Sequence, residues 1–280
     1  MIDVVLTAFT SRGFKIANYS DVRGCMDFVA VKDGEKYVVR VLSNVDALRE
    51  ESVEEFVRLA ELLGATPIIV GERTKRDLLQ DGVIYRRYGV PVVTKSTISE
   101  ILDGTIPTSE VYNGRTLVYF NPDSFRAARQ SLGLSQNDLA QRIGTTKDSI
   151  YRYEHGYPAL EPVARRIVSI LGADVLAPVR LFDGQKSKKG VFPFRRAPWD
   201  IFVAGAKRVA LSAARGVVRR KVELLQRGKG VVHDYYAMIV TSQTRITISE
   251  NVKVPTLLEA ELKELKKPKD IVKRVEEEFE

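Results

Sequence analysis

The stretch that decides the fold is residues 132–156, which read LGLSQNDLAQRIGTTKDSIYRYEHG. Ser135, followed three positions later by Asp138, is close to a capping box, which predicts that a helix begins directly after Ser135. Gly144 breaks that helix, and Thr146 is placed to cap a second one. Two short helices joined by a turn that contains glycine form the core of a helix-turn-helix, so this stretch predicts an all-helical unit.

The predicted helical unit extends to both sides of this stretch. Pro122 suits the first position of an earlier helix that runs to Ser131. Apolar contacts between the helices are expected from Leu139, Ala140, Ile143, Ile150 and Tyr153. These contacts leave the polar face of the helix over 147–154, the recognition helix, available to the major groove of DNA.

The pattern resembles the phage-repressor family of helix-turn-helix proteins from Phe125 to Leu171. The resemblance implies a unit of five helices in which Arg129 and Glu154 form a structural ion pair between the first and third helices. It also implies that Gln136 holds a DNA phosphate near the start of the second helix.

In that family, the positions of Lys147, Asp148 and Arg152 reach base edges. The residue types fit, because lysine and arginine donate to guanine O6 and N7, and aspartate accepts from cytosine N4. Thr146 and Ser149 suit a phosphate or a thymine methyl group. A solvated helix face is the alternative for each of these five residues, and we expect two or three to contact DNA. The candidate DNA-binding residues are Ser135, Gln136, Thr146, Lys147, Asp148, Ser149 and Arg152.

The residues on either side of the helical unit mix helix and strand patterns. Before it, strands are expected over 26–31, 37–42, 67–70, 83–85 and 90–93, and helices over 4–9, 50–63 and 98–102. After it, a long helix is expected over 201–226, with Arg208, Arg215 and Arg219 on one face, followed by strands over 235–241 and 245–249 and a final helix.

The chain is therefore expected to be multidomain, α/β plus all-α. The expected parts are an N-terminal α/β domain over 1–110, a helix-turn-helix domain over 119–182, a basic linker over 183–198 and a C-terminal α/β domain over 199–280.

The N-terminal part resembles the restriction-endonuclease fold, and within it the archaeal Holliday-junction resolvases, over about residues 12–95. Those enzymes hold Mg²⁺ with an Asp on one strand and the Glu of a Glu-x-Lys on the next. Here Asp27 matches the Asp, but Val38 and Arg40 stand at the Glu and Lys positions. One carboxylate holds Mg²⁺ poorly beside a polyanion, so we expect an inactive domain with a hydrogen-bonded, structural Asp27.

The combination of parts resembles a family of archaeal helix-turn-helix transcriptional regulatory proteins over the whole chain. The shared elements include the strand end at 41–46, VLSNVD, and the run at 82–91, GVIYRRYGVP. The resemblance implies regulation of transcription through DNA, with the operator and any small-molecule effector unknown.

Composition limits the alternatives. The net charge is +8, and residues 121–230 carry 21 Lys/Arg against nine Asp/Glu, which fits a phosphate-binding surface or a solubilising one. With one cysteine and two histidines, we expect no metal site and no cofactor. Without a long apolar run or a signal peptide, we expect a cytoplasmic protein with no membrane partner.

Three functions compete. The first is a sequence-specific regulator that binds double-stranded DNA, is not an enzyme, and forms a homodimer through a flanking domain. The second is a metal-dependent nuclease guided by its helix-turn-helix. The third is an architectural or partner-binding protein anchored on DNA. A preference for one duplex over random DNA separates the first from the third, and metal-dependent cleavage would support the second.

Overall fold

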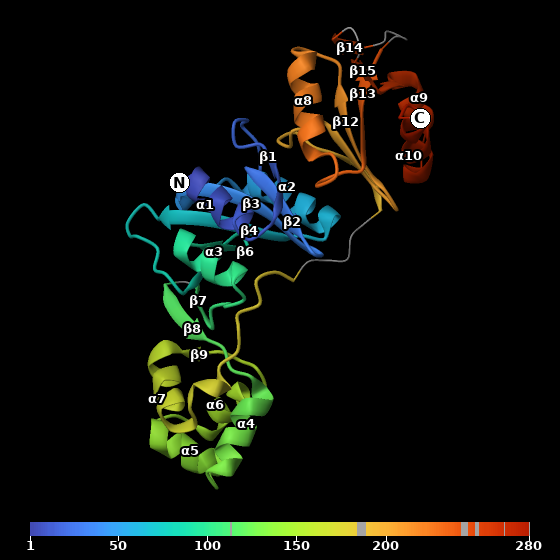
Figure 1. Ribbon diagram of the computed structural model, residues 1–280. Helices are drawn as coiled ribbons and strands as arrows, with labels where there is room; N and C mark the ends of the chain where they lie inside the picture. The colour runs from blue at the N-terminus through green and yellow to red at the C-terminus, as the bar shows by residue number, and fades with distance from the viewer. Residues whose placement is uncertain (113, 184–188, 242–245, 250–251, 266, 280) are drawn as a thin grey trace. The chain divides into compact units, whose positions relative to one another are not determined.

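The computed structural model describes residues 1–280 except 113, 184–188, 242–245, 250–251, 266 and 280 (Figure 1). The chain divides into two compact units. Unit 1 combines Met1–Ile69 with Phe182–Glu280, and unit 2 is Val70–Leu181. Together they give a multidomain fold of mixed sheets and helices plus an all-helical region, as the sequence predicts.

The N-terminal segment of unit 1 is an α/β layer with strand order β1-β2-β3-β4. Its elements are α1 (Ile2–Thr10), β1 (Lys15–Asn18), β2 (Phe28–Lys32), β3 (Glu35–Asn44), the 3-10 helix η1 (Val45–Ala47), α2 (Glu50–Leu63) and the start of β4 (Thr66–Arg73). The predicted hairpin joins β2 to β3 through Asp33 and Gly34, both with positive φ. The predicted helix over 50–63 is α2, which ends at left-handed Gly64.

The C-terminal segment of unit 1 is a second α/β layer with strand order β10-β11-β12-β13-β16. Its elements are β10 (Gly190–Pro193), β11 (Ile201–Ala204), β12 (Arg208–Ala213), α8 (Val218–Gly228), β13 (Tyr235–Val240), β16 (Thr256–Leu258), α9 (Glu259–Glu264) and α10 (Pro268–Glu276), with a separate pair β14 (Ile246–Ser249) and β15 (Val252–Val254). Apolar residues of β11, β12, β13, β16 and α10 form one buried cluster.

The long helix predicted over 201–226 is wrong. Residues 201–204 and 208–213 form the antiparallel pair β11–β12, and only α8 is helical. Strands that are buried on both faces consist of short apolar runs, and two such runs in sequence resemble the apolar face of one helix. Arg208 therefore lies on β12, Arg215 in the following loop and Arg219 on α8, and they share no helix face.

The segment predicted as a linker is partly structured. Its residues 190–193 form β10, which pairs with β11, while 184–188 lie outside the described residues.

The two segments of unit 1 pack against each other. The Asp21 carboxylate accepts a hydrogen bond from Arg227 Nη1 at 2.7 Å and pairs with Arg220 at 2.5 Å. The hydrogen bond from Arg227 lowers the pKa of Asp21 to about 2. Nearby, the buried Tyr19 and Trp199 rings lie edge to face with centroids 5.9 Å apart. Residues from both ends of the chain thus complete one unit.

Unit 2 contains strands in the order β6-β5-β7-β8-β9 and a set of helices. Its elements are β5 (Ile84–Arg87), β6 (Val90–Val93), α3 (Lys95–Leu102), β7 (Ser109–Tyr112), β8 (Arg115–Val118), α4 (Pro122–Ser131), α5 (Gln136–Ile143), α6 (Lys147–Tyr153), β9 (Ala159–Leu160), α7 (Glu161–Leu171) and the 3-10 helix η2 (Ala173–Val175). The predicted helical region is thus four α-helices and one 3-10 helix, interrupted by the two-residue β9, which pairs with β8.

Arg86 organises the polar interior of unit 2. Its Nε donates to Glu110 Oε2 at 2.9 Å, and its Nη2 donates to the carbonyl oxygen of Arg180 at 2.7 Å. Tyr119 donates to the other oxygen of Glu110 at 2.7 Å. Burial, followed by this bond, raises the pKa of Tyr119 to about 12. Throughout the described part of the chain, no helix has both the length and the apolar character to cross a bilayer.

Candidate nucleic-acid interface

The two helices of the helix-turn-helix begin and end as their sequence predicts. Ser135 caps α5, and its hydroxyl accepts from Asp138 N while Asp138 accepts from Ser135 N at 2.8 Å, which completes a capping box. Hydrogen bonding of the Asp138 carboxylate to the side chain of Ser135, and then to its backbone nitrogen, lowers the pKa of Asp138. Gly144 ends α5 in the left-handed conformation. The Thr146 hydroxyl caps α6 by accepting from Ser149 N at 3.2 Å.

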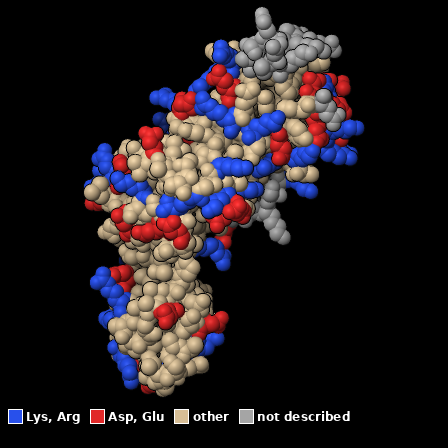
Figure 2. Space-filling model, viewed as in Figure 1, with Lys and Arg blue, Asp and Glu red and all other residues tan. Residues whose placement is uncertain are grey.

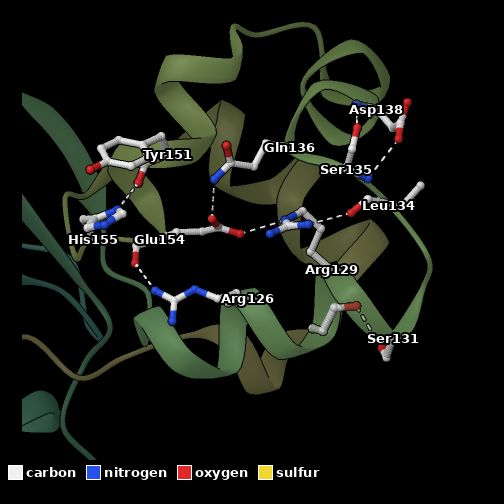
Figure 3. Close-up of polar contacts among 11 residues, drawn as sticks. Arg126, Arg129, Ser131, Leu134, Ser135, Gln136, Asp138, Tyr151, Glu154 and His155 are labelled. Carbon is white, nitrogen blue, oxygen red and sulfur yellow. Dashed lines mark hydrogen bonds and ion pairs between the residues drawn. The ribbon is translucent and has the colours of Figure 1, made fainter.

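A buried network fixes α6 relative to α4 and α5 (Figure 3). Arg129 Nε of α4 donates to Glu154 Oε1 at 2.7 Å, and both side chains are at most 10% exposed. Gln136 Nε2 donates to the other carboxylate oxygen of Glu154 at 2.6 Å. Arg129 Nη1 also donates to the carbonyl oxygen of Leu134 at 2.6 Å. The Arg129–Glu154 ion pair that the resemblance implies is confirmed.

The network gives Gln136 a contact that the sequence did not predict. The amide nitrogen of Gln136 is bonded to Glu154 inside the unit, so the side chain serves the scaffold. A phosphate contact of Gln136 stays a prediction, and its amide has a second hydrogen with which to make one.

Apolar packing decides which face of α6 is exposed. Ile150 is fully buried in the cluster that includes Phe125, Leu139 and Ile143, and Tyr153 packs against that cluster. On the remaining surface Lys147, Asp148 and Arg152 are exposed, Ser149 is half-buried, and the N-cap Thr146 is exposed. The predicted base-reading residues therefore share one outward surface with two hydroxyl groups at its amino end.

An aromatic group that we did not predict lies at the carboxyl end of α6. Tyr151 is 53% exposed, and its ring lies 4.0 Å from that of His155. His155 Nδ1 is bonded to the carbonyl oxygen of Tyr151 (Figure 3). The Arg152 guanidinium lies 4.9 Å above the ring of Tyr157. Tyr151 follows Lys147 by four residues, so helical spacing alone could have placed it on this surface.

The basic charge is concentrated less in the helix-turn-helix than the sequence analysis implied. Residues 121–182 carry eight Lys/Arg and six Asp/Glu, whereas residues 183–230 carry 13 and three. Figure 2 shows the face of α4–α7 in that view as mostly uncharged, with Lys and Arg along its edge. Most of the excess positive charge of residues 121–230 therefore lies after the helix-turn-helix domain.

The nuclease-like site of unit 1 does not fit a catalytic metal. Asp27 Oδ1 accepts from Arg40 Nη1 at 3.2 Å, and Asp27 Oδ2 accepts from Val41 N at 2.6 Å. Val38 is fully buried. Burial, partly offset by Arg40, raises the pKa of Asp27. Among the described residues, no group of three or more His, Cys, Asp or Glu side chains is arranged to hold a metal ion. Both carboxylate oxygens of Asp27 are thus hydrogen-bonded within the fold, and a purely structural role for this residue stays a prediction.

Comparison with known proteins gives two domains. The PD-(D/E)XK superfamily domain matches residues 1–107, and a helix-turn-helix domain matches residues 125–175. No solved structure matches the chain.

Relatives from archaea are named "Putative HTH-type transcriptional regulatory protein", and two of them match over nearly their whole length. The protein of Archaeoglobus fulgidus is 28% identical over 99% of this chain and 97% of its own length. That of Thermococcus gammatolerans is 26% identical over 99% and 95%. A Pyrococcus furiosus protein is 34% identical over 66% of this chain and 59% of its own length. The chain is thus similar over its whole length to these archaeal proteins, and it combines a PD-(D/E)XK superfamily domain at its N-terminus with a helix-turn-helix domain in its middle.

Proposed function

We propose that this protein regulates transcription by binding double-stranded DNA in a sequence-specific manner, with α6 in the major groove. The observation that carries the proposal is the surface of α6, where Lys147, Asp148 and Arg152 are exposed while Ile150 is fully buried. A helix with polar side chains on one face and a fixed apolar face on the other is what major-groove recognition requires.

Each residue of the surface has a matching partner in DNA. Lys147 and Arg152 are donors for guanine O6 and N7, and Asp148 is an acceptor for cytosine N4. The Thr146 and Ser149 hydroxyls, with Ser135 and Gln136 at the start of α5, are placed at helix amino ends, where phosphate groups bind. Tyr151 adds a flat apolar contact for a thymine methyl group or a sugar.

Selection of bound sequences from a pool of random duplexes tests the proposal. We expect a short, recurrent sequence to be enriched, and a purified duplex with that sequence to bind much more tightly than a scrambled one at equal salt. Equal affinity for both duplexes would favour the architectural alternative, in which DNA is only an anchor.

We also propose a homodimer, because one helix-turn-helix reads only a short half-site and two-fold symmetry doubles it. The α/β segment at 1–110 or the one at 199–280 is the proposed dimerising domain, and 119–182 is the proposed DNA-binding domain. The location of chromosomal DNA makes the cytoplasm the proposed compartment. Light scattering of the full chain, free and on DNA, should give the mass of two copies, and a monomer in both states would contradict this.

A further inference from the structure

Unit 1 contains a cavity of about 530 Å³ lined in part by Arg40, the residue at the lysine position of the nuclease motif. Its walls come from the loop before β2, the end of β3, the first turns of α2, Ile69 of β4 and the segment after β10. Five arginines line it: Arg23, Arg40, Arg49, Arg195 and Arg196. None of its lining residues is an aspartate or a glutamate.

Most of this positive charge is not neutralised by the protein. Arg40 pairs with Asp27 at 3.2 Å, and Arg196 pairs with Glu51 at 2.9 Å. Within the described ranges, the guanidinium groups of Arg23, Arg49 and Arg195 have no hydrogen-bond or ion-pair partner. Guanidinium groups gathered around one cavity repel one another, so an anion placed among them would lower the energy of the site.

The wall formed by residues 195 and 196 is held firmly in place. Both backbone nitrogens donate to the carboxylate of Glu55, Arg195 N at 3.1 Å and Arg196 N at 2.8 Å. Cys25 N donates to the carbonyl oxygen of Arg196 at 2.7 Å. A Cβ added to Gly24 would lie 2.8 Å from that same oxygen, so only glycine fits there. Glu55 is thus used by the backbone and leaves the two arginine side chains free of it.

The cavity also has an apolar side. The half-buried Leu42 and Leu48 and the exposed Ala47 give it accessible apolar surface, and the almost fully buried Phe56 and Ile69 are also among its lining residues. The first turn of α2 contributes Arg49, Ser52 and Val53 to the lining. The positive end of the helix dipole therefore adds to the field of the arginines.

We propose that this cavity binds a small phosphate-bearing ligand, of the class of nucleoside phosphates. Arginine pairs with phosphate through two parallel hydrogen bonds, and three unpaired arginines match a group with two or three negative charges. The apolar side suits a base. The volume is in the range of small-molecule sites and too small for a duplex. The proposal does not rest on DNA recognition by α6, because it concerns the free protein.

Titration calorimetry of the full chain without DNA tests this, with inorganic pyrophosphate and ADP as separate probes. We expect saturable binding of one ligand per chain, with ADP tighter than pyrophosphate because of the apolar side. Arg23→Ala and Arg49→Ala should each weaken binding at least about tenfold, since each removes charge-assisted hydrogen bonds. Arg58→Ala, an exposed arginine of α2 outside the cavity, is the matched control and should bind like the native protein.

The Arg49→Lys variant keeps the positive charge but loses the two parallel hydrogen bonds of the guanidinium group. It should therefore bind the probes more weakly than the native protein but more tightly than Arg49→Ala does. Thermal unfolding of each variant reports whether it is folded. No binding of either probe at millimolar concentration, or equal binding by the double variant Arg23→Ala/Arg49→Ala, would overturn the proposal. The proposal would also be contradicted if the double variant bound every DNA duplex more weakly by the same factor while its affinity for ADP did not change. The cavity would then bind the DNA backbone.

Discussion

At the scale of single residues, the exposed side chains of α6 should separate base contacts from phosphate contacts. Lys147→Ala and Arg152→Ala should each cost about 1–3 kcal/mol on the preferred duplex and relax the preference at one base pair. Binding to the preferred and to singly substituted duplexes measures both effects. Arg166→Ala, an exposed arginine of α7, is the control and should change neither. A loss that is the same on every duplex would assign the residues to phosphate.

The buried carboxylate of Glu154 should matter for stability as much as for DNA. Glu154→Ala leaves the buried Arg129 without its partner, and breaking a buried ion pair in this way typically costs about 3–5 kcal/mol. Urea unfolding of the native and variant chains measures the change. Glu161→Ala removes only the exposed pair with Arg165 and should cost less than about 1 kcal/mol. An equal loss of unfolding free energy in both variants would contradict the view that the Arg129–Glu154 pair stabilises the domain from its interior.

Residue identity predicted the ion pair but only part of the network. A buried arginine with a glutamate 25 positions away is visible in sequence only through the family resemblance. The bond from Gln136 to Glu154 was not predicted, because a polar side chain at a helix start looks the same whether it faces DNA or the interior. The loss of a carboxylate from the nuclease motif was predictable, because the hydrocarbon side chain of Val38 cannot ligate a metal ion.

At the scale of elements, the capping box gives α5 a measurable pH dependence. Ser135→Ala should destabilise unit 2 by about 1 kcal/mol, a typical cost for the loss of an N-cap. The pKa of Asp138 is lowered in the folded state, so its contribution is complete above its ordinary pKa and is lost as the pH falls through the lowered value. The midpoint temperatures of thermal unfolding of the native protein and of Asp138→Asn, measured at a series of pH values, should therefore become equal in acid. A constant difference at every pH would show that the carboxylate is not involved.

Elements with local signals were predictable, and those defined by pairing were not. Helices α2 and α5 carry a glycine C-cap, and α5 and α6 carry a side-chain N-cap, so their bounds follow from nearby residues. Strands β11 and β12 are defined by their partners, and the local turn signal between them is the single residue Gly205. Apart from that glycine, the two apolar runs resemble one face of a helix.

At the scale of the whole molecule, the nuclease fold should not give nuclease activity. The two oxygens of Asp27 are bonded to Arg40 and Val41, and Val38 offers no ligand, so Mg²⁺ would lack the carboxylate set it needs. Incubation of the pure protein with duplex, single-stranded and four-way-junction DNA in Mg²⁺ and Mn²⁺ should leave each intact. Cleavage that disappears in Asp27→Asn would show that the site is active.

The assembly of unit 1 from both ends of the chain sets an order of events on the ribosome. Residues 70–181 emerge as one continuous piece and contain all of unit 2, so that unit can fold as soon as it leaves the exit tunnel. The contacts of Asp21 with Arg227 and of Tyr19 with Trp199 can form only after roughly 200 further residues have been synthesised. A nascent chain stalled once residue 182 has cleared the exit tunnel should therefore carry a protease-resistant helix-turn-helix unit attached to an N-terminal segment that is still open to cleavage.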